Sequence, residues 1–248
     1  MFSERRAYRW LKALSGERVA GTDGELRAFG IITSALDKMG LSWREEKFSV
    51  SISCGHAGRV EVGDRAFEGV PIALSVPYEV EGELVYLDHP QCGKDVLLDL
   101  KGKIVLLGTM ANREDRFMLQ DKGVKGIIGI ASPLRLAPSL HYSQTDVEKG
   151  DTLPAIVVAH TDGLRLRKLA GRHVKIVADG VTEKREGRSV IVDIPGKVHD
   201  EFLYVMGHYD TVPFSPGASD NAGGTAILLE LLYVFSKKRL ARPLRFFF

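Results

Sequence analysis

The periodicity of apolar residues changes near Trp43, and this change limits which folds the chain can adopt. Before it, apolar residues recur at three- and four-residue spacings, which is the pattern of one buried face of an α-helix. After it, apolar residues form short runs separated by turn residues such as Gly63 and Asp64, which is typical of β-strands. We therefore expect a helical front segment followed by a β-rich unit.

Two helices are predicted in the front segment. The first is amphipathic and includes Trp10 and Leu14. Thr22 precedes the second and can accept a hydrogen bond from the helix backbone, while Glu25 can reach back to Thr22 in a capping box. Apolar side chains of the second helix should face a core; they are Leu26, Phe29, Ile32, Ala35, Leu36 and Met39.

Further along, strands are expected to alternate with helices, as in an α/β protein. Residues 180–187 are polar and bounded by glycines, which is the composition of an exposed connection between domains. After this connection we expect strands at 189–194, 202–206 and 244–248, and a helix at 221–235. Before it, we expect strands at 47–53, 59–62, 83–87, 103–107, 126–130 and 155–159, and helices near 116–122 and 164–169.

Composition excludes several classes of protein. The 34 basic and 32 acidic residues are interspersed and leave a net charge of +2, so we expect no nucleic-acid or membrane partner. Two cysteines are too few for a disulfide framework. The first residues lack the apolar core of a secretory signal, so we expect a cytoplasmic protein.

Polar residues follow the expected strand at 202–206. His208 and Asp210 lie at its carboxyl end, where open α/β sheets bind their ligands. Residues two apart on a strand point to the same side, so these two can face one cavity or form a metal ligand and its supporting carboxylate. The alternative is a histidine satisfied by local hydrogen bonds, because so short a motif recurs freely.

Asp220 stands before a glycine-rich helix start. A carboxylate there can cap the helix, which the helix dipole favours. It can also bridge two cations in a two-metal site. Both interpretations stay open from the residues alone.

A longer motif carries a family resemblance. Residues 208–213 (HYDTVP) and 215–224 (SPGASDNAGG) resemble the co-catalytic di-zinc aminopeptidase family, which includes bacterial leucyl aminopeptidases and relatives such as glutamate carboxypeptidase and the transferrin receptor ectodomain. Residues 18–25 (RVAGTDGE) resemble the front segment of that family. The middle of the chain is similar to the protease-associated domain that many members insert, notably at 100–106, 122–128 and 153–158.

This resemblance implies a fold and a site. The fold is a partial doubly wound mixed sheet of the zinc-peptidase type with an inserted β-rich protease-associated domain. Residues 1–48 and 182–248 belong to the peptidase domain and residues 49–181 to the insert. His208 ligates one zinc ion, Asp220 bridges two, and Asp210 orients His208 as the catalytic carboxylate. The resemblance also implies a cis peptide bond between Asp220 and Asn221.

The implied activity is that of a metallo-aminopeptidase, which removes N-terminal residues from a peptide substrate through a water activated by two zinc ions. Family members carry a glutamate base and further ligands after the next strand, which here is 244–248. We therefore expect the chain alone to be inactive, its last strand to lack a cover, and a second chain supplying the missing half, or a homo-oligomer, as its partner. The alternatives are a non-catalytic receptor-like or peptide-binding protein of the same fold and a carboxypeptidase-like amidohydrolase.

Overall fold

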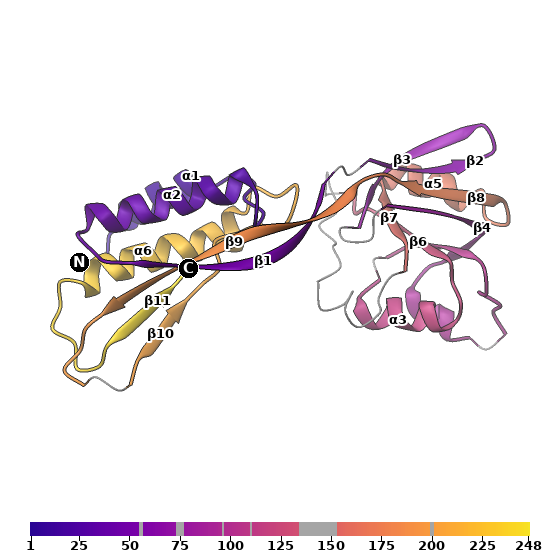
Figure 1. Cartoon of the computed structure of the whole chain (residues 1–248). Helices are drawn as coiled ribbons and strands as arrows, with labels where there is room; N and C mark the ends of the chain where they lie inside the picture. Colours follow the sequence, from indigo (N-terminus) through magenta and orange to yellow (C-terminus); the bar gives the residue numbers. More distant parts are fainter. Residues whose placement is uncertain (55–56, 73–76, 96, 110, 134–152, 199–200) are drawn as a thin grey trace. The chain divides into compact units, whose positions relative to one another are not determined.

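The chain forms two compact units. The computed structural model describes residues 1–54, 57–72, 77–95, 97–109, 111–133, 153–198 and 201–248 (Figure 1). Unit 1 comprises Met1–Val50 and Lys184–Phe248, and unit 2 comprises Ser51–Glu183. These divisions each lie two residues beyond the boundaries expected from the sequence, at 48/49 and 181/182.

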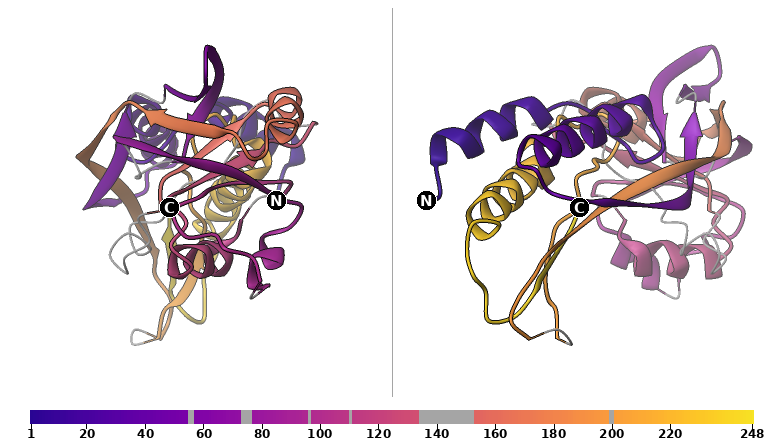
Figure 2. Two further views of the ribbon diagram at one scale, coloured as in Figure 1. Left: turned by 90° about the vertical axis from the view of Figure 1, so that its right-hand side faces the viewer. Right: turned by 60° about the vertical axis from the view of Figure 1, so that its left-hand side comes forward.

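Unit 1 holds a four-stranded mixed sheet in the order β1-β9-β11-β10. β11 runs parallel to β10 and antiparallel to β9. The chain leaves unit 1 along β1 and returns along β9. Three helices lie together on one face of this sheet (Figures 1 and 2). The bounds are β1 Arg44–Cys54, β9 Val181–Ile194, β10 Leu203–Met206, β11 Leu244–Phe247, α1 Glu4–Leu14, α2 Asp23–Lys38 and α6 Gly223–Phe235.

Alternate residues of β9 and β11 face these helices, because successive side chains of a strand point to opposite sides. Val192 and Phe246 pair across the two strands and are fully buried. From α2, Ile32 and Leu36 pack into the same core. Leu26 was expected there but is 44% exposed. Its position lies about 120° around the helix from Ile32, at about 100° per residue, and therefore outside the buried stripe.

An ion pair between the partly exposed Arg6 and the buried Glu230 joins α1 to α6. Glu230 of α6 is fully buried, and both of its carboxylate oxygens accept hydrogen bonds from the Arg6 guanidinium. The backbone N–H of Ser3 donates to the same carboxylate at 2.9 Å. The pair thereby fixes the start of the chain against α6.

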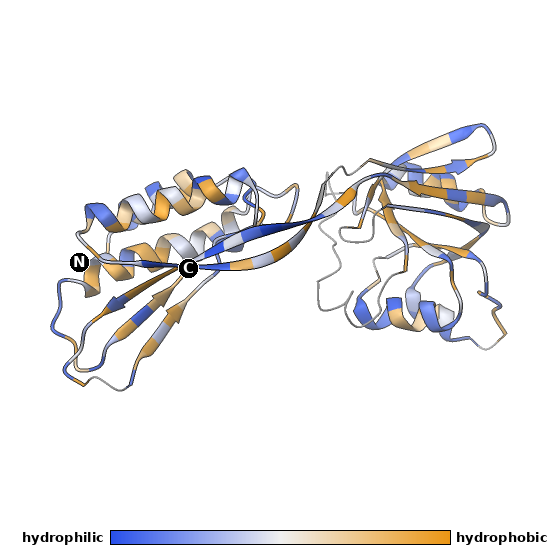
Figure 3. Cartoon of the chain, in the orientation of Figure 1, coloured by the Kyte–Doolittle hydropathy of each residue, from blue (hydrophilic) through white to orange (hydrophobic). Residues whose placement is uncertain are grey.

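The edge strands of the sheet are β1 and β10. We expected residues 244–248 to form the uncovered strand, and this was wrong because β11 lies between β9 and β10. Phe246 and Phe248 are 0% and 3% exposed. On β10, Leu203, Tyr204 and Met206 are 49%, 57% and 63% exposed, and apolar residues follow one another along this strand (Figure 3).

Unit 2 is a closed barrel with the strand order β2-β3-β7-β6-β5-β4-β8. The strands β4, β5, β6 and β7 pair in parallel, and the remaining pairs are antiparallel. Two apolar clusters fill the unit, one around Ile104 and Ile128 and the other around Val105 and Leu119. The bounds are β2 Gly58–Val62, β3 Arg65–Pro71, β4 Tyr78–Leu87, η1 Pro90–Lys94, β5 Ile104–Leu107, α3 Arg113–Asp121, β6 Gly126–Ile130, β7 Ala155–Val158, α5 His160–Arg167 and β8 His173–Ala178.

The expected mixed α/β class is confirmed, with differences in detail. β3 and β8 were not predicted: β3 (RAFEGVP) lacks a regular alternation of apolar and polar residues, whereas β8 (HVKIVA) has an apolar, strand-like sequence that was overlooked. Residues 180–187 are largely exposed, as expected, but most of them belong to β9, which begins at Val181. The described helices of unit 1 cover one face of the sheet, so the doubly wound arrangement stays a prediction, as does the assignment of unit 2 as a protease-associated domain. No helix in the described segments is both long and apolar enough to cross a bilayer.

Candidate functional site

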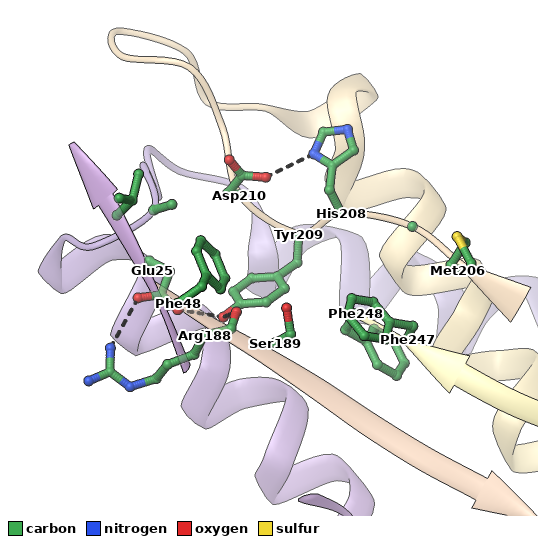
Figure 4. A pocket seen from close by; sticks show the side chains of 13 residues that line it. Glu25, Phe48, Arg188, Ser189, Met206, His208, Tyr209, Asp210, Phe247 and Phe248 are labelled. Atoms are coloured by element: carbon green, nitrogen blue, oxygen red, sulfur yellow. Dashed lines mark hydrogen bonds and ion pairs between the residues drawn. The ribbon is translucent and has the colours of Figure 1, made fainter. Parts of the chain in front are cut away.

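The loop that follows β10 carries two of the candidate residues. β10 ends at Met206, and the N–H of Gly207 still bonds to the carbonyl of Phe247 at 3.1 Å, which holds the start of the loop against the sheet. Beyond it, Nδ1 of His208 lies 3.0 Å from Oδ1 of Asp210. Figure 4 shows these two side chains pointing toward one another. Their expected arrangement as neighbours on one side of the chain is confirmed.

Asp220 comes from a different segment, Ala218–Ala222 before α6, in which the backbone of Asp220 and Asn221 is not helical. Its Oδ1 lies 3.1 Å from Nε2 of His208, so the imidazole stands between two carboxylates. The Asp220 side chain is 86% exposed, and the peptide bond between Asp220 and Asn221 is cis, as expected from the resemblance. The convergence of His208 and Asp220 is also as expected.

Capping of α6 belongs to Asn221 rather than to Asp220. The side-chain Oδ1 of Asn221 accepts a hydrogen bond from the N–H of Gly224 at 3.2 Å. Its Nδ2 donates to the carbonyl of His208 at 3.1 Å. Thr225 on the first turn of α6 also lies within hydrogen-bond distance of that carbonyl, at 3.2 Å. No role was predicted for Asn221 or Thr225, although Asn is one of the residues favoured at helix starts.

Tyr209 points away from the His208–Asp210 pair, into the interior of unit 1 (Figure 4). Its ring is 3% exposed, and its hydroxyl lies 2.5 Å from Oε1 of Glu25 and 2.8 Å from the carbonyl of Arg188. The other oxygen of Glu25 lies 3.4 Å from Nη1 of Arg188. Burial and the Glu25 carboxylate raise the pKa of Tyr209 far above its ordinary value, so the phenol stays protonated and serves as a donor.

The capping box predicted at Thr22 forms only in part. The Thr22 hydroxyl accepts from the N–H of Glu25 at 3.5 Å. The Glu25 side chain is 1% exposed and binds Tyr209 and Arg188, while the N–H of Thr22 bonds to the carbonyl of Val19. The Glu25 carboxylate therefore binds side chains from distant parts of the chain instead of the backbone at the start of α2.

A cavity of about 370 Å³ adjoins the site within unit 1 (Figure 4). His208 and Asp210 lie at one side of it, and the buried Glu25–Arg188 pair at another. Apolar side chains, among them Phe48, Met206 and Phe247, supply much of the remaining wall. Among the described residues, no three His, Cys, Asp or Glu side chains are gathered closely enough to hold a metal ion.

A protein-family model matches the part of the chain that holds these residues. Residues 189–248 match the family model of peptidase family M28. This M28 segment includes His208, Asp210 and Asp220.

Named relatives extend the likeness over the whole chain. It is 28% identical to aminopeptidase YwaD of Bacillus subtilis, over 99% of this chain and 54% of the relative. It is 27% identical to the probable lipoprotein aminopeptidase LpqL of Mycobacterium tuberculosis, over 88% of this chain and 45% of the relative. The fold matches a crystal structure of a zinc aminopeptidase from Bacillus subtilis with a TM-score of 0.76 and 24% identity, over 100% of this chain and 61% of that one. The chain thus spans about half the length of these two curated relatives.

Proposed function

We propose that this chain carries part of the active site of a zinc-dependent aminopeptidase. The observation that carries the proposal is the approach of His208 Nε2 to Asp220 Oδ1 at 3.1 Å, with Asp210 on the other ring nitrogen. Both similar curated proteins are named aminopeptidases, and the similar solved structure is described as a zinc enzyme. The M28 match over the segment that holds these residues supports the same conclusion.

The side chains present suit zinc as donors. Imidazole nitrogen and carboxylate oxygen are ordinary zinc ligands, and a ligating histidine usually has a carboxylate or carbonyl on its second nitrogen. Asp210 occupies that place for His208. The exposed Asp220 carboxylate has room for further contacts, which a residue bridging two ions requires. His208 and Asp220 therefore fit as two donors of a larger ligand set.

Each residue then has a distinct task. Asp210 holds the imidazole so that Nε2 faces Asp220. Asn221 and Thr225 hold the backbone of His208 from the start of α6. Zinc, when bound, polarises a peptide carbonyl and makes water a better nucleophile at neutral pH. The substrate is proposed to be a peptide whose first residue is removed.

The described residues supply two donors, whereas catalytic zinc sites usually take three from the protein. We propose that the remaining donors and a general base come from outside the described residues, on the same or on a second chain. The 248 residues are accordingly expected to bind zinc weakly and to be inactive by themselves. The cytoplasmic location and a homo-oligomer stay predictions.

Zinc titration of the purified chain tests the donor assignment. His208→Ala and Asp220→Asn should each abolish measurable zinc binding in isothermal titration calorimetry. Asp210→Asn should weaken it by about tenfold to a hundredfold, the usual loss when a supporting carboxylate is removed. His173→Ala and Asp64→Asn are matched controls at exposed positions of unit 2 and should leave the affinity unchanged. Equal affinity in all variants would remove the proposed site.

Hydrolysis of an aminoacyl amide tests whether activity requires donors and a base from outside the described residues. The chain alone should show no hydrolysis that a metal chelator abolishes. A chain that binds two zinc ions and turns over this substrate would show that its ligand set is complete, which contradicts the need for outside donors.

A further inference from the structure

Arg18 is a fully buried arginine whose side chain reaches the backbone of both site loops. It is 0% exposed and is among the largest fully buried side chains of the described chain. Its Nε donates to the carbonyl of Tyr209, the residue between His208 and Asp210. Its Nη2 donates to the carbonyl of Gly217 at 2.8 Å and its Nη1 to that of Pro216 at 3.1 Å, shortly before Asp220.

The backbone of Arg18 adds two more links to the same loops. Its N–H donates to the hydroxyl of Thr211 at 2.9 Å, and the N–H of Thr211 donates to its carbonyl at 3.2 Å. The front segment also donates from the N–H of Gly16 to the carbonyl of Pro216 at 2.8 Å. One short stretch of chain thus holds both segments that carry the candidate ligands.

No carboxylate lies within ion-pair distance of Arg18 in the described part of the chain. A buried cation without such a partner is costly unless its donors are satisfied. Here four backbone carbonyls accept from the planar guanidinium, including that of Gly16. Burial lowers the pKa of Arg18, whereas the Asp210 and Asp220 carboxylates act in the opposite direction. The Asp210 and Asp220 carboxylates are thus close enough to favour the charged form of Arg18 electrostatically.

We propose that Arg18 is a positioning residue that clamps the two ligand-bearing loops, 208–211 and 216–220, so that His208 and Asp220 stand at ligand spacing before metal binds. The metal-binding part of this inference rests on the proposed function. The clamp itself rests on the hydrogen bonds within the metal-free chain. A simple structural role would predict lost stability without any specific loss of metal affinity.

Two measurements on the full chain test the clamp. Arg18→Met keeps an unbranched apolar side chain in place of the arginine stem and removes the charge and the donors. Hydrogen–deuterium exchange of residues 209–222 without metal should rise at least tenfold in this variant, and its zinc affinity should fall by about tenfold to a hundredfold, the range of lost supporting contacts. Arg245→Met is the matched control, since it breaks another arginine contact of unit 1, with Asp193 on the neighbouring strand β9. It should change neither the exchange of 209–222 nor the affinity.

Each outcome tests either the positioning role of Arg18 or the proposed zinc binding. If Arg18→Met folds and both values match the wild type, or if exchange rises while affinity stays constant, the positioning role is wrong. If Arg18→Met does not fold, Thr211→Val and Arg18→Lys are judged by the same criteria. If the wild-type chain binds no zinc, the proposed function fails, and the exchange of 209–222 still decides whether Arg18 clamps the loops.

Discussion

At the scale of single residues, adjacent positions of one loop serve opposite purposes. His208 and Asp210 are 55% and 43% exposed and face each other, whereas Tyr209 between them is buried. The alternation is the same as that of successive side chains on a strand, although these residues lie beyond the end of β10. The loop is therefore held from the interior by Tyr209 while its neighbours stay accessible to a ligand.

Tyr209→Phe should lower the free energy of unfolding by about 1–3 kcal/mol, because the buried Glu25 carboxylate loses a hydrogen-bond donor. Urea denaturation at pH 7 measures the change. Tyr8→Phe, at a position that is 61% exposed, is the control and should be neutral. Equal stability of the two variants would mean that the Tyr209 hydroxyl contributes nothing to holding the loop.

Gly217→Ala should destabilise unit 1 more than an ordinary glycine replacement. Gly217 has φ +54°, and an added Cβ would come within 2.1 Å of a Thr211 methyl carbon and 2.9 Å of Arg18 Nη1. Gly40 has a similar φ of +70° with open space around it, so Gly40→Ala measures the backbone strain alone, about 1–2 kcal/mol. The excess loss for Gly217→Ala, read from denaturation midpoints, reports the close approach of the two loops. Equal losses would contradict it.

At the scale of elements, the docking of α1 onto α6 is expected to depend on pH. Burial raises the pKa of Glu230, but the hydrogen bonds from Arg6 and the Ser3 N–H outweigh it, and the net pKa lies below the ordinary value. A lowered pKa in the folded state stabilises the protein above the unfolded-state pKa of about 4.3, and this stabilisation is lost as the pH falls through the folded-state pKa. Acid should therefore weaken the contact between α1 and α6.

Glu230→Gln should cost about 1.5–3 kcal/mol at pH 7, the usual contribution of hydrogen bonds to a charged group. The difference from the wild type should begin to shrink as the pH falls below the unfolded-state pKa of about 4.3, and it should be lost as the pH falls through the lower folded-state pKa. Thermal denaturation across pH 3–7 measures it. Glu46→Gln, at an exposed position of β1, should show no such trend. A difference that is constant with pH would exclude the ion pair as its source.

At the scale of the whole molecule, unit 2 carries its own core and a closed barrel without unpaired strand edges. The excised segment 51–183 should therefore fold alone. Its thermal unfolding, followed by circular dichroism, should be cooperative, with a midpoint within a few degrees of one transition of the full chain. As a control, segment 51–183 with Leu106→Asp, which places a charge in the barrel core, should not fold. A non-cooperative wild-type segment would show that unit 2 depends on unit 1.

Local patterns were sufficient for many features of this protein. Helix α2 follows from apolar residues at three- and four-residue spacings, and the pairing of His208 with Asp210 follows from the two-residue repeat of a strand. The buried strands β5 to β7 follow from short apolar runs. The place of Asp220 came from a family resemblance, since periodicity could not distinguish a metal ligand from a helix cap. Strand β3 escaped prediction because its sequence has no regular alternation, and its pairing with β2 and β7 defines it as a strand.

Contacts between distant segments decided the rest. Glu25 has the local sequence of a helix cap, yet its carboxylate is taken by Tyr209, 184 positions away. Arg18 is charged and would be expected at the surface, but carbonyls about 190 positions along the chain satisfy its donors in the interior. β11 became a central strand because β10 and β9 both pair with it. A short stretch of sequence contains no information on partners from distant segments. A buried polar group is stable only where the folded chain places a hydrogen-bonding partner beside it.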